Sequence, residues 1–135
     1  MTIAQPALDA LHVHGPPTRI AVVGASNDPA KYGNIIVKNL ISHGYCVLPV
    51  HPTAPRIAEL PAYAEVGDIP GPIDIANLVV PPPLALDIVR ALDPQQVRVV
   101  WLQPGSFDDA VVSAARAKFQ HVVAGDCIMV VARWA

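Results

Sequence analysis

The residues of this chain with the most chemical potential follow its first apolar run. Residues 19–24 are rich in β-branched side chains and predict a buried strand, and a polar segment, residues 24–34, comes directly after it. Gly24 permits a tight turn, and Gly33 permits a close approach of the backbone to a ligand. Ser26 and Asn34 can donate hydrogen bonds, and Lys31 adds a positive charge.

This segment predicts a phosphate site if a helix begins at its end. The free N–H groups at a helix N-terminus favour an anion there. A simpler reading stays open, because Gly, Ser, Asn, Asp and Pro are also the usual residues of turns and caps, and Asp28 could be only a cap.

The next strand end bears on which nucleotide the chain would bind. Residues 45–50 predict a second strand, which is followed by His51 and Pro52. An enzyme that uses a nicotinamide dinucleotide would carry an acid here for the ribose hydroxyls, and the sequence has none. His51 and Arg56 suit a phosphate near the ribose, as in coenzyme A (3′-phosphate) or NADP (2′-phosphate). His51 as an ordinary loop histidine is the alternative.

Three further strand ends offer polar or apolar groups. Residues 73–80 end in an apolar wall at Val80 and Pro81, and residues 97–102 are followed by Gln103 and Gly105. Gln103 could hydrogen-bond a ligand, or only the neighbouring backbone. Residues 106–109 resemble a capping box that begins at Ser106.

The fifth expected strand, residues 121–124, leads to Cys127. This cysteine could form a mixed disulfide with the thiol of a ligand. The commoner role of a lone cysteine is inert packing.

The order of these elements predicts the fold. Strands alternate with helical patterns and short connections, which indicates an α/β protein with a single doubly wound parallel sheet, Rossmann-like, of about five strands in the order 3-2-1-4-5 with helices on both faces. Residues 1–17 are expected to form an N-terminal leader and residues 18–135 the domain. The proline-rich residues 51–72 allow one helical turn, around residues 63–66.

Composition narrows the class of protein. Of the 135 residues, 53% are hydrophobic and 15% are charged, as expected for a sheet covered on both faces. A net charge of −2 gives no general attraction to nucleic acid or anionic membranes. We see no signal peptide, no apolar stretch that could cross a bilayer and no disulfide framework, and therefore expect a cytoplasmic protein.

Familiar catalytic motifs are missing from the sequence. There is no G-x-S-x-G, H-E-x-x-H or C-x-x-C pattern, and no metal site is expected. The glycine loop is neither G-x-G-x-x-G nor a P-loop. A binding, carrier or sensor module therefore fits better than an enzyme.

Five segments in order resemble the stand-alone coenzyme-A-binding proteins, a family related to the nucleotide-binding domain of the succinyl-CoA synthetase α subunit and of ADP-forming acyl-CoA synthetases. The segments are residues 20–33, 44–52, 68–74, 100–105 and 126–127. The resemblance implies coenzyme A or an acyl-CoA as ligand, with the pyrophosphate at residues 24–33 and the adenosine between the ends of the second and third strands. It implies as binding residues Gly24, Ala25, Ser26, Pro29, Lys31, Tyr32, Gly33, Asn34, His51, Pro52, Val80, Pro81, Gln103 and Gly105.

This sequence departs from the family at two places, and two other functions stay open. The family commonly has Asn where His51 stands, and residues 81–83 are an unusually rigid run of prolines. The alternatives are an NADP-binding oxidoreductase and an interaction protein with a vestigial nucleotide cleft. A homodimer or a larger enzyme is the expected kind of protein partner.

Overall fold

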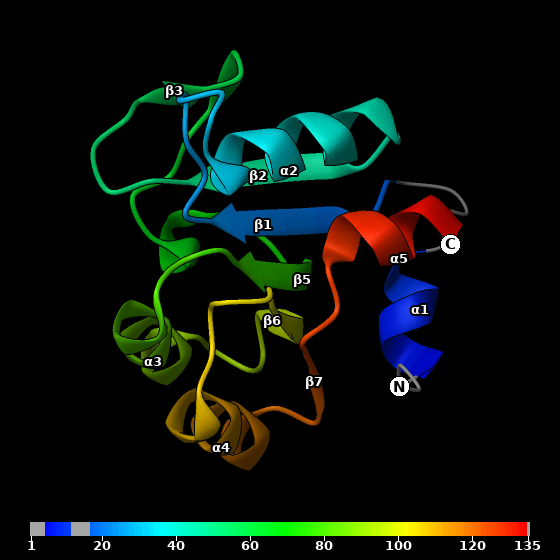
Figure 1. Cartoon of the computed structure of the whole chain (residues 1–135), viewed down its shortest axis with the longest axis vertical. Helices are drawn as coiled ribbons and strands as arrows, with labels where there is room; N and C mark the ends of the chain where they lie inside the picture. The colour runs from blue at the N-terminus through cyan, green and yellow to red at the C-terminus, as the bar shows by residue number, and fades with distance from the viewer. Residues whose placement is uncertain (1–4, 12–16, 135) are drawn as a thin grey trace.

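A five-stranded parallel sheet forms the centre of the molecule (Figure 1), and the computed structural model describes residues 5–11 and 17–134. Its strands are β1 (Arg19–Val23), β2 (Cys46–Val50), β5 (Ile73–Leu78), β6 (Val97–Leu102) and β7 (His121–Ala124). Every pair of neighbours in this sheet is parallel. The predicted Rossmann-like α/β class is confirmed.

The predicted strand order is wrong. The observed order is β2-β1-β5-β6-β7, which is 2-1-3-4-5 when only the strands of this sheet are counted, in place of 3-2-1-4-5. The outer edge of β2 is occupied by the segment at Tyr63, whose N–H donates to the Pro49 carbonyl while its own carbonyl accepts from the His51 N–H. The third sheet strand, β5, pairs instead with the free side of β1. Successive strands are therefore added to opposite sides of β1, and the resulting switch point between β1 and β5 is where ligands of such sheets bind.

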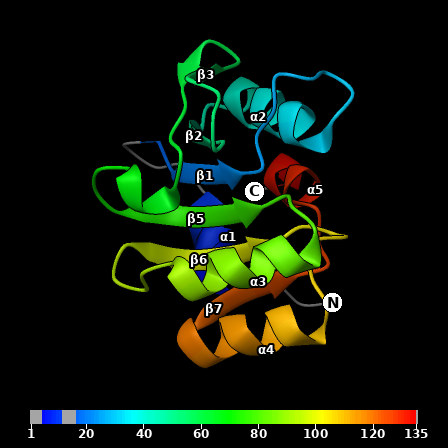
Figure 2. The same ribbon diagram turned by 90° about the vertical axis from the view of Figure 1, so that its left-hand side faces the viewer.

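Helices cover both faces of the sheet, as the apolar patterns predict. α3 (Pro82–Ala91) and α4 (Asp109–Lys118) lie on one face, and α1 (Gln5–Leu11), α2 (Tyr32–Ser42) and α5 (Ile128–Trp134) lie on the other (Figures 1 and 2). Each face has its own apolar core. Ile36 and Leu40 of α2 join Trp101 in one core, and Ala85 and Val89 of α3 lie in the other.

Residues 51–72 contain a small hairpin that the sequence did not predict. β3 (Arg56–Ile57) pairs antiparallel with β4 (Leu60–Pro61), and a 3-10 helix, η1 (Val66–Asp68), follows. The helical turn expected at residues 63–66 is thus displaced to η1. The hairpin turn uses Ala58 and Glu59 at positive φ, where two-residue turns normally use Asn and Gly, so no turn signal was visible.

Part of the predicted leader packs on the domain, and residues 1–4 and 12–16 lie outside the described residues. Ala7 and Leu11 of α1 are buried in the core on the α2 face. The Tyr45 hydroxyl donates to the Leu11 carbonyl oxygen at 2.7 Å, and this bond ties α1 to the chain just before β2. The division of the chain at residue 18 stays a prediction.

Tyr45→Phe should show what this bond contributes. Removing the hydroxyl should lower the free energy of unfolding by about 1 kcal/mol, because the buried Leu11 carbonyl loses its donor. Burial also raises the pKa of Tyr45 above its ordinary 10.0. The unfolded chain therefore loses this proton first as pH rises, so stability is unaffected below about pH 10 and declines above it.

Urea unfolding on both sides of pH 10 measures both effects. Tyr45→Phe should be less stable than the wild type at neutral pH and should show a shallower alkaline decline. Equal alkaline slopes for the two proteins would contradict the assignment of this pKa shift to Tyr45.

Candidate functional site

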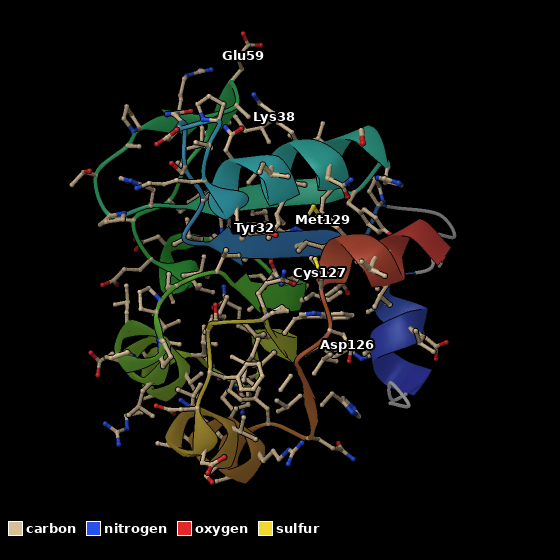
Figure 3. All side chains as sticks on the ribbon, viewed as in Figure 1. Tyr32, Lys38, Glu59, Asp126, Cys127 and Met129 are labelled. Atoms are coloured by element: carbon tan, nitrogen blue, oxygen red, sulfur yellow. The ribbon has the colours of Figure 1, made fainter. Side chains whose placement is uncertain are left out.

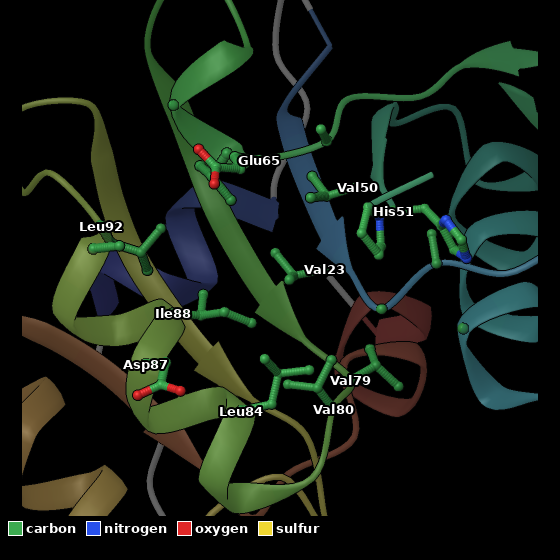
Figure 4. A pocket seen from close by; sticks show the side chains of 18 of the residues that line it. Val23, Val50, His51, Glu65, Val79, Val80, Leu84, Asp87, Ile88 and Leu92 are labelled. Atoms are coloured by element: carbon green, nitrogen blue, oxygen red, sulfur yellow. The ribbon is translucent and has the colours of Figure 1, made fainter. Parts of the chain in front are cut away.

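A cavity of about 870 Å³ opens at the carboxyl ends of β1, β2 and β5, at the switch point of the strand order. Its walls are the loop after β1 with the start of α2, the loop after β2 with residues 64–67, and α3. Val23, Val50 and Ile88 line its middle, and Glu65 lies at one end (Figure 4). The volume falls in the range of small-molecule sites, about 300–1,000 Å³.

Most of the predicted binding residues line this cavity, although their contact with a ligand stays a prediction. The lining residues among them are Gly24, Ala25, Ser26, Lys31, Tyr32, Gly33, His51, Pro52 and Val80. The predicted residues that do not line it are Pro29, Asn34, Pro81, Gln103 and Gly105.

The loop after β1 is held in shape by its own side chains. The Ser26 hydroxyl accepts from the Asp28 N–H at 3.0 Å, and the Asp28 carboxylate accepts from the Ala30 N–H at 2.9 Å. Asn34 is buried in α2 and donates to the Ser26 carbonyl at 2.9 Å. The Asn34 amide thus positions the loop, while the Ser26 hydroxyl keeps its proton for a ligand.

The start of α2 presents free backbone donors beside the cavity. Among the described residues, no partner is found for the N–H groups of Ser26, Tyr32 or Gly33, and Lys31 at the N-cap position provides no side-chain cap. The first turn of α2 carries no acidic residue. Free amides, the positive end of the helix dipole and the Lys31 ammonium together favour an anion at this point.

Two glycines allow the backbone segments around the site to pack directly against one another. A Cβ on Gly33 would overlap the Gly24 carbonyl oxygen, and a Cβ on Gly24, which has φ +97°, would overlap the Val79 carbonyl oxygen. Gly33 was predicted to make room for a ligand. Its observed role is to let α2 pack directly on the turn after β1.

His51 organises the loop after β2. Its Nδ1 accepts from the N–H groups of Thr53 at 3.1 Å and Ala54 at 2.9 Å, so the neutral ring carries its proton on Nε2. His51 therefore has a structural role in its loop. Its ring also lines the cavity, and its contact with a phosphate stays a prediction. An Asn at this position could offer its side-chain oxygen to the same two N–H groups.

Two variants separate these roles of His51. His51→Asn should keep the turn, with stability within about 0.5 kcal/mol of the wild type, whereas His51→Ala should lose about 1–2 kcal/mol because two loop N–H groups lose their acceptor. Thermal unfolding measures this difference. Equal losses in the two variants would show that the acceptor atom is not what the loop requires.

Gln103 is a structural residue in this chain. Its side chain is buried, and its Oε1 accepts from Asn77 Nδ2 at 3.1 Å and from the Ile128 N–H at 2.7 Å. Its amide nitrogen donates to Cys127 Sγ at 3.4 Å. Gln103 thus joins β5, β6 and the start of α5. The alternative reading, in which its side chain bonds only the neighbouring backbone, is wrong about the partners. Cys127 is free, half-buried and outside the lining of the cavity.

The predicted capping box at Ser106 is also wrong. The N-cap of α4 is Asp108, whose carboxylate accepts from the Val111 N–H at 3.0 Å. The Ser106 hydroxyl instead accepts from the Val80 N–H at 3.1 Å and fixes the chain as it leaves β5. Pro81 occupies the N-cap position of α3, where no N–H is needed.

Sequence reasoning missed the wall of the cavity that α3 and η1 provide. These residues are Ala64, Glu65, Val66, Gly67, Leu84, Asp87, Ile88, Ala91, Leu92, Asp93 and Gln96. Leu84 is 49% exposed, an unusual position for a leucine that the lining of an apolar cavity accounts for. The helical spacing of Ile88 and Leu92 was visible in the sequence, but it predicts packing on the sheet equally well.

Neither a cluster of metal ligands nor a membrane-spanning helix is found within the described ranges. The described residues contain no group of His, Cys, Asp or Glu side chains arranged to hold a metal ion. None of the described helices combines the length and apolar character that a bilayer span requires.

The parallel sheet and its switch point define an α/β protein of the Rossmann-like class, and the turn after β1 offers free donors that favour an anion. A family model described as CoA binding domain matches residues 18–133, which is most of the chain. The chain therefore belongs to the CoA-binding domain family, as the five segments of its sequence predicted.

Individual relatives agree with this family. The chain is 46% identical over 66 residues to the α subunit of the ADP-forming acetate–CoA ligase II of Pyrococcus furiosus, and that match covers 48% of this chain and 14% of the subunit. It is 29% identical over 112 residues to the uncharacterized protein YneT of Bacillus subtilis, with 83% of each chain covered. A conserved hypothetical protein from P. furiosus has a similar structure, with a TM-score of 0.78, 37% identity, and 84% of this chain and 97% of that chain covered.

Proposed function

We propose that this chain binds coenzyme A or an acyl-CoA in the cavity at the carboxyl edge of its sheet and acts as a binding, carrier or sensor module. One observation carries the proposal: the free N–H groups of Tyr32 and Gly33 and the Lys31 side chain meet at one end of a cavity that is otherwise largely apolar. Such a cavity offers an electropositive end that attracts an anion and an apolar end, which complements the phosphates and the base of an adenine nucleotide.

The diphosphate is assigned to the turn after β1. Lys31 and the α2 dipole would stabilise its negative charge, and the free amides and the Ser26 hydroxyl would donate hydrogen bonds to its oxygens. A second phosphate on the ribose would lie toward His51, whose Nε2 is not used by the loop, and toward Arg56.

The adenosine is assigned to the apolar part of the cavity, between the loop after β2 and α3. Val50, Val80 and Ile88 line it, and such side chains suit the faces of a purine. The carboxylates of Glu65, Asp87 and Asp93 belong to the part of the cavity wall beside η1 and along or just after α3 (Figure 4 labels the first two). They would repel a phosphate, so they favour the orientation with the phosphates toward Lys31.

A stand-alone role is supported by the relatives of similar length. YneT and the P. furiosus hypothetical protein are covered over most of their lengths, whereas the acetate–CoA ligase subunit is about seven times the length of its matched region. A partner enzyme that supplies or accepts the acyl-CoA is compatible with the same site.

Calorimetric titration with coenzyme A, dephospho-CoA and NADP tests the proposal. Coenzyme A should bind at micromolar concentration, and dephospho-CoA should bind about tenfold more weakly if a basic side chain reads the ribose phosphate. NADP should bind more weakly than coenzyme A. The absence of heat with coenzyme A at sub-millimolar concentration would refute the proposal, and preference for NADP would favour the oxidoreductase alternative.

A further inference from the structure

Asn27, which does not line the cavity, connects the loop after β1 to the β3–β4 hairpin. Its Nδ2 donates to the Arg56 carbonyl oxygen at 2.8 Å, and its Oδ1 accepts from the Ala58 N–H at 3.2 Å. The whole side-chain amide is therefore engaged with a segment about 30 residues further along the chain. The loop and the hairpin lie next to each other at the upper end of the molecule (Figure 1).

The hairpin turn that Asn27 contacts is strained. Ala58 and Glu59 have φ values of 50° and 67°, in the left-handed region that disfavours residues other than Gly and Asn. Glu59 is exposed at the tip of the hairpin (Figure 3), and the Arg56 guanidinium donates to the Glu59 carbonyl at 3.1 Å. Strained backbone persists only where its surroundings hold it. The two bonds of Asn27 and the bond from Arg56 are side-chain contacts that support this turn in addition to the β3–β4 pairing.

The hairpin has a firm base of its own. Ile57 is fully buried in the core beneath α2, and Ala58 and Leu60 pack against the same core. A loop fastened to this hairpin is therefore fastened to the body of the protein. The bonds from Ser26 and Asp28 lie within the loop, so they shape it without attaching it to another segment.

We infer that Asn27 is a positioning residue: it ties the phosphate-binding turn to the strained hairpin and so holds the Ser26 amide and hydroxyl in register with the start of α2. The inference rests on the proposed function, because it assigns a role in ligand binding to a side chain that does not touch the ligand. It also makes ligand binding and hairpin order mutually dependent.

Asn27→Ala should weaken coenzyme A binding about fivefold, because the docked geometry of the loop is then populated only part of the time. Asn27→Asp keeps the acceptor for the Ala58 N–H, loses the donor to the Arg56 carbonyl and adds a negative charge beside the phosphate-binding turn, so its loss should be larger. Asn39→Ala is the matched control, since Asn39 lies in α2 and does not line the cavity. Its affinity should equal that of the wild type.

Relaxing the turn separates the effect of the bonds between loop and hairpin from the effect of hairpin order. Ala58→Asn with Glu59→Gly installs the pair that two-residue turns prefer, so the hairpin should form without help from Asn27. Added to Asn27→Ala, this pair should restore order to the hairpin but not the affinity, because the loop after β1 is still not bonded to the hairpin. In the wild type, coenzyme A should slow hydrogen exchange of the Ala58 amide, as reciprocity requires.

Each outcome separates the inference from the proposed function. Wild-type affinity in Asn27→Ala would overturn the inference while leaving the proposed function in place. Wild-type affinity in the triple variant would also overturn the inference, because the order of the hairpin alone, and not its bonds to Asn27, would then determine the affinity. A wild-type protein that does not bind coenzyme A would refute both.

Discussion

Gly33→Ala is expected to abolish tight binding of coenzyme A and to destabilise the fold at the same time. On helix propensity alone, alanine near the start of α2 would be favoured by about 0.5–1 kcal/mol. The structure predicts a decrease in the free energy of unfolding instead, because the added methyl would overlap the Gly24 carbonyl oxygen, a backbone atom that cannot easily move aside. Such overpacking costs about 1–3 kcal/mol, and a shift of about 1 Å in a site can reduce its function about 100-fold.

Gly67→Ala is the control for this substitution. Gly67 also lines the cavity, but a Cβ there would meet no atom within 4 Å, and its φ is not positive. Its free energy of unfolding should match that of the wild type. A Gly33→Ala protein as stable as Gly67→Ala would contradict the close packing of α2 on the turn.

Lys31→Met is expected to weaken coenzyme A binding about tenfold without destabilising the fold. The Lys31 side chain is exposed at the start of α2, and no hydrogen bond from its ammonium is found within the described part of the chain. A charge-assisted hydrogen bond to a phosphate contributes about 1.5–3 kcal/mol, and exposure to solvent places Lys31 at the low end of that range. Titration calorimetry at several salt concentrations measures the loss.

Lys38→Met is the matched control for the charge. Lys38 is exposed on the same helix, nearly two turns further from the proposed phosphate position, and it does not line the cavity (Figure 3). Its affinity should stay within about twofold of the wild type, since its charge is largely screened at that distance. The affinity of Lys31→Met for coenzyme A should also depend less on salt concentration than the affinity of the wild type does. Equal effects of the two substitutions would indicate a diffuse charge effect rather than a phosphate contact.

The class of fold follows from local patterns, but the strand order does not. Apolar runs and helical spacing locate the five strands and the helices between them to within a few residues. The order depends on which edge of the sheet is free for the third strand, and Tyr63 decides this by occupying the outer edge of β2. Tyr63 lies in a proline-rich stretch whose short hairpin has no glycine or asparagine in its turn, so the sequence carries no clear sign of it.

The candidate site was partly predictable for a similar reason. Strand ends identify Gly24, Lys31, His51 and Val80 as neighbours, because parallel strands bring their carboxyl ends to one edge. Gln103 also follows a strand, but its side chain accepts hydrogen bonds from Asn77 and from the Ile128 N–H. These bonds join segments far apart in the sequence, so no local pattern predicts them. The α3 wall was missed because an apolar residue beside a cavity has the same spacing as one that packs on a sheet.

The most direct test is an amide chemical-shift titration of the ¹⁵N-labelled protein with coenzyme A. The account predicts the largest changes at Ser26, Tyr32 and Gly33, whose N–H groups would gain diphosphate oxygens as partners, with smaller changes near Ile88. Changes confined to the opposite edge of the sheet, around Arg98 and His121 where a second cavity lies, would contradict it.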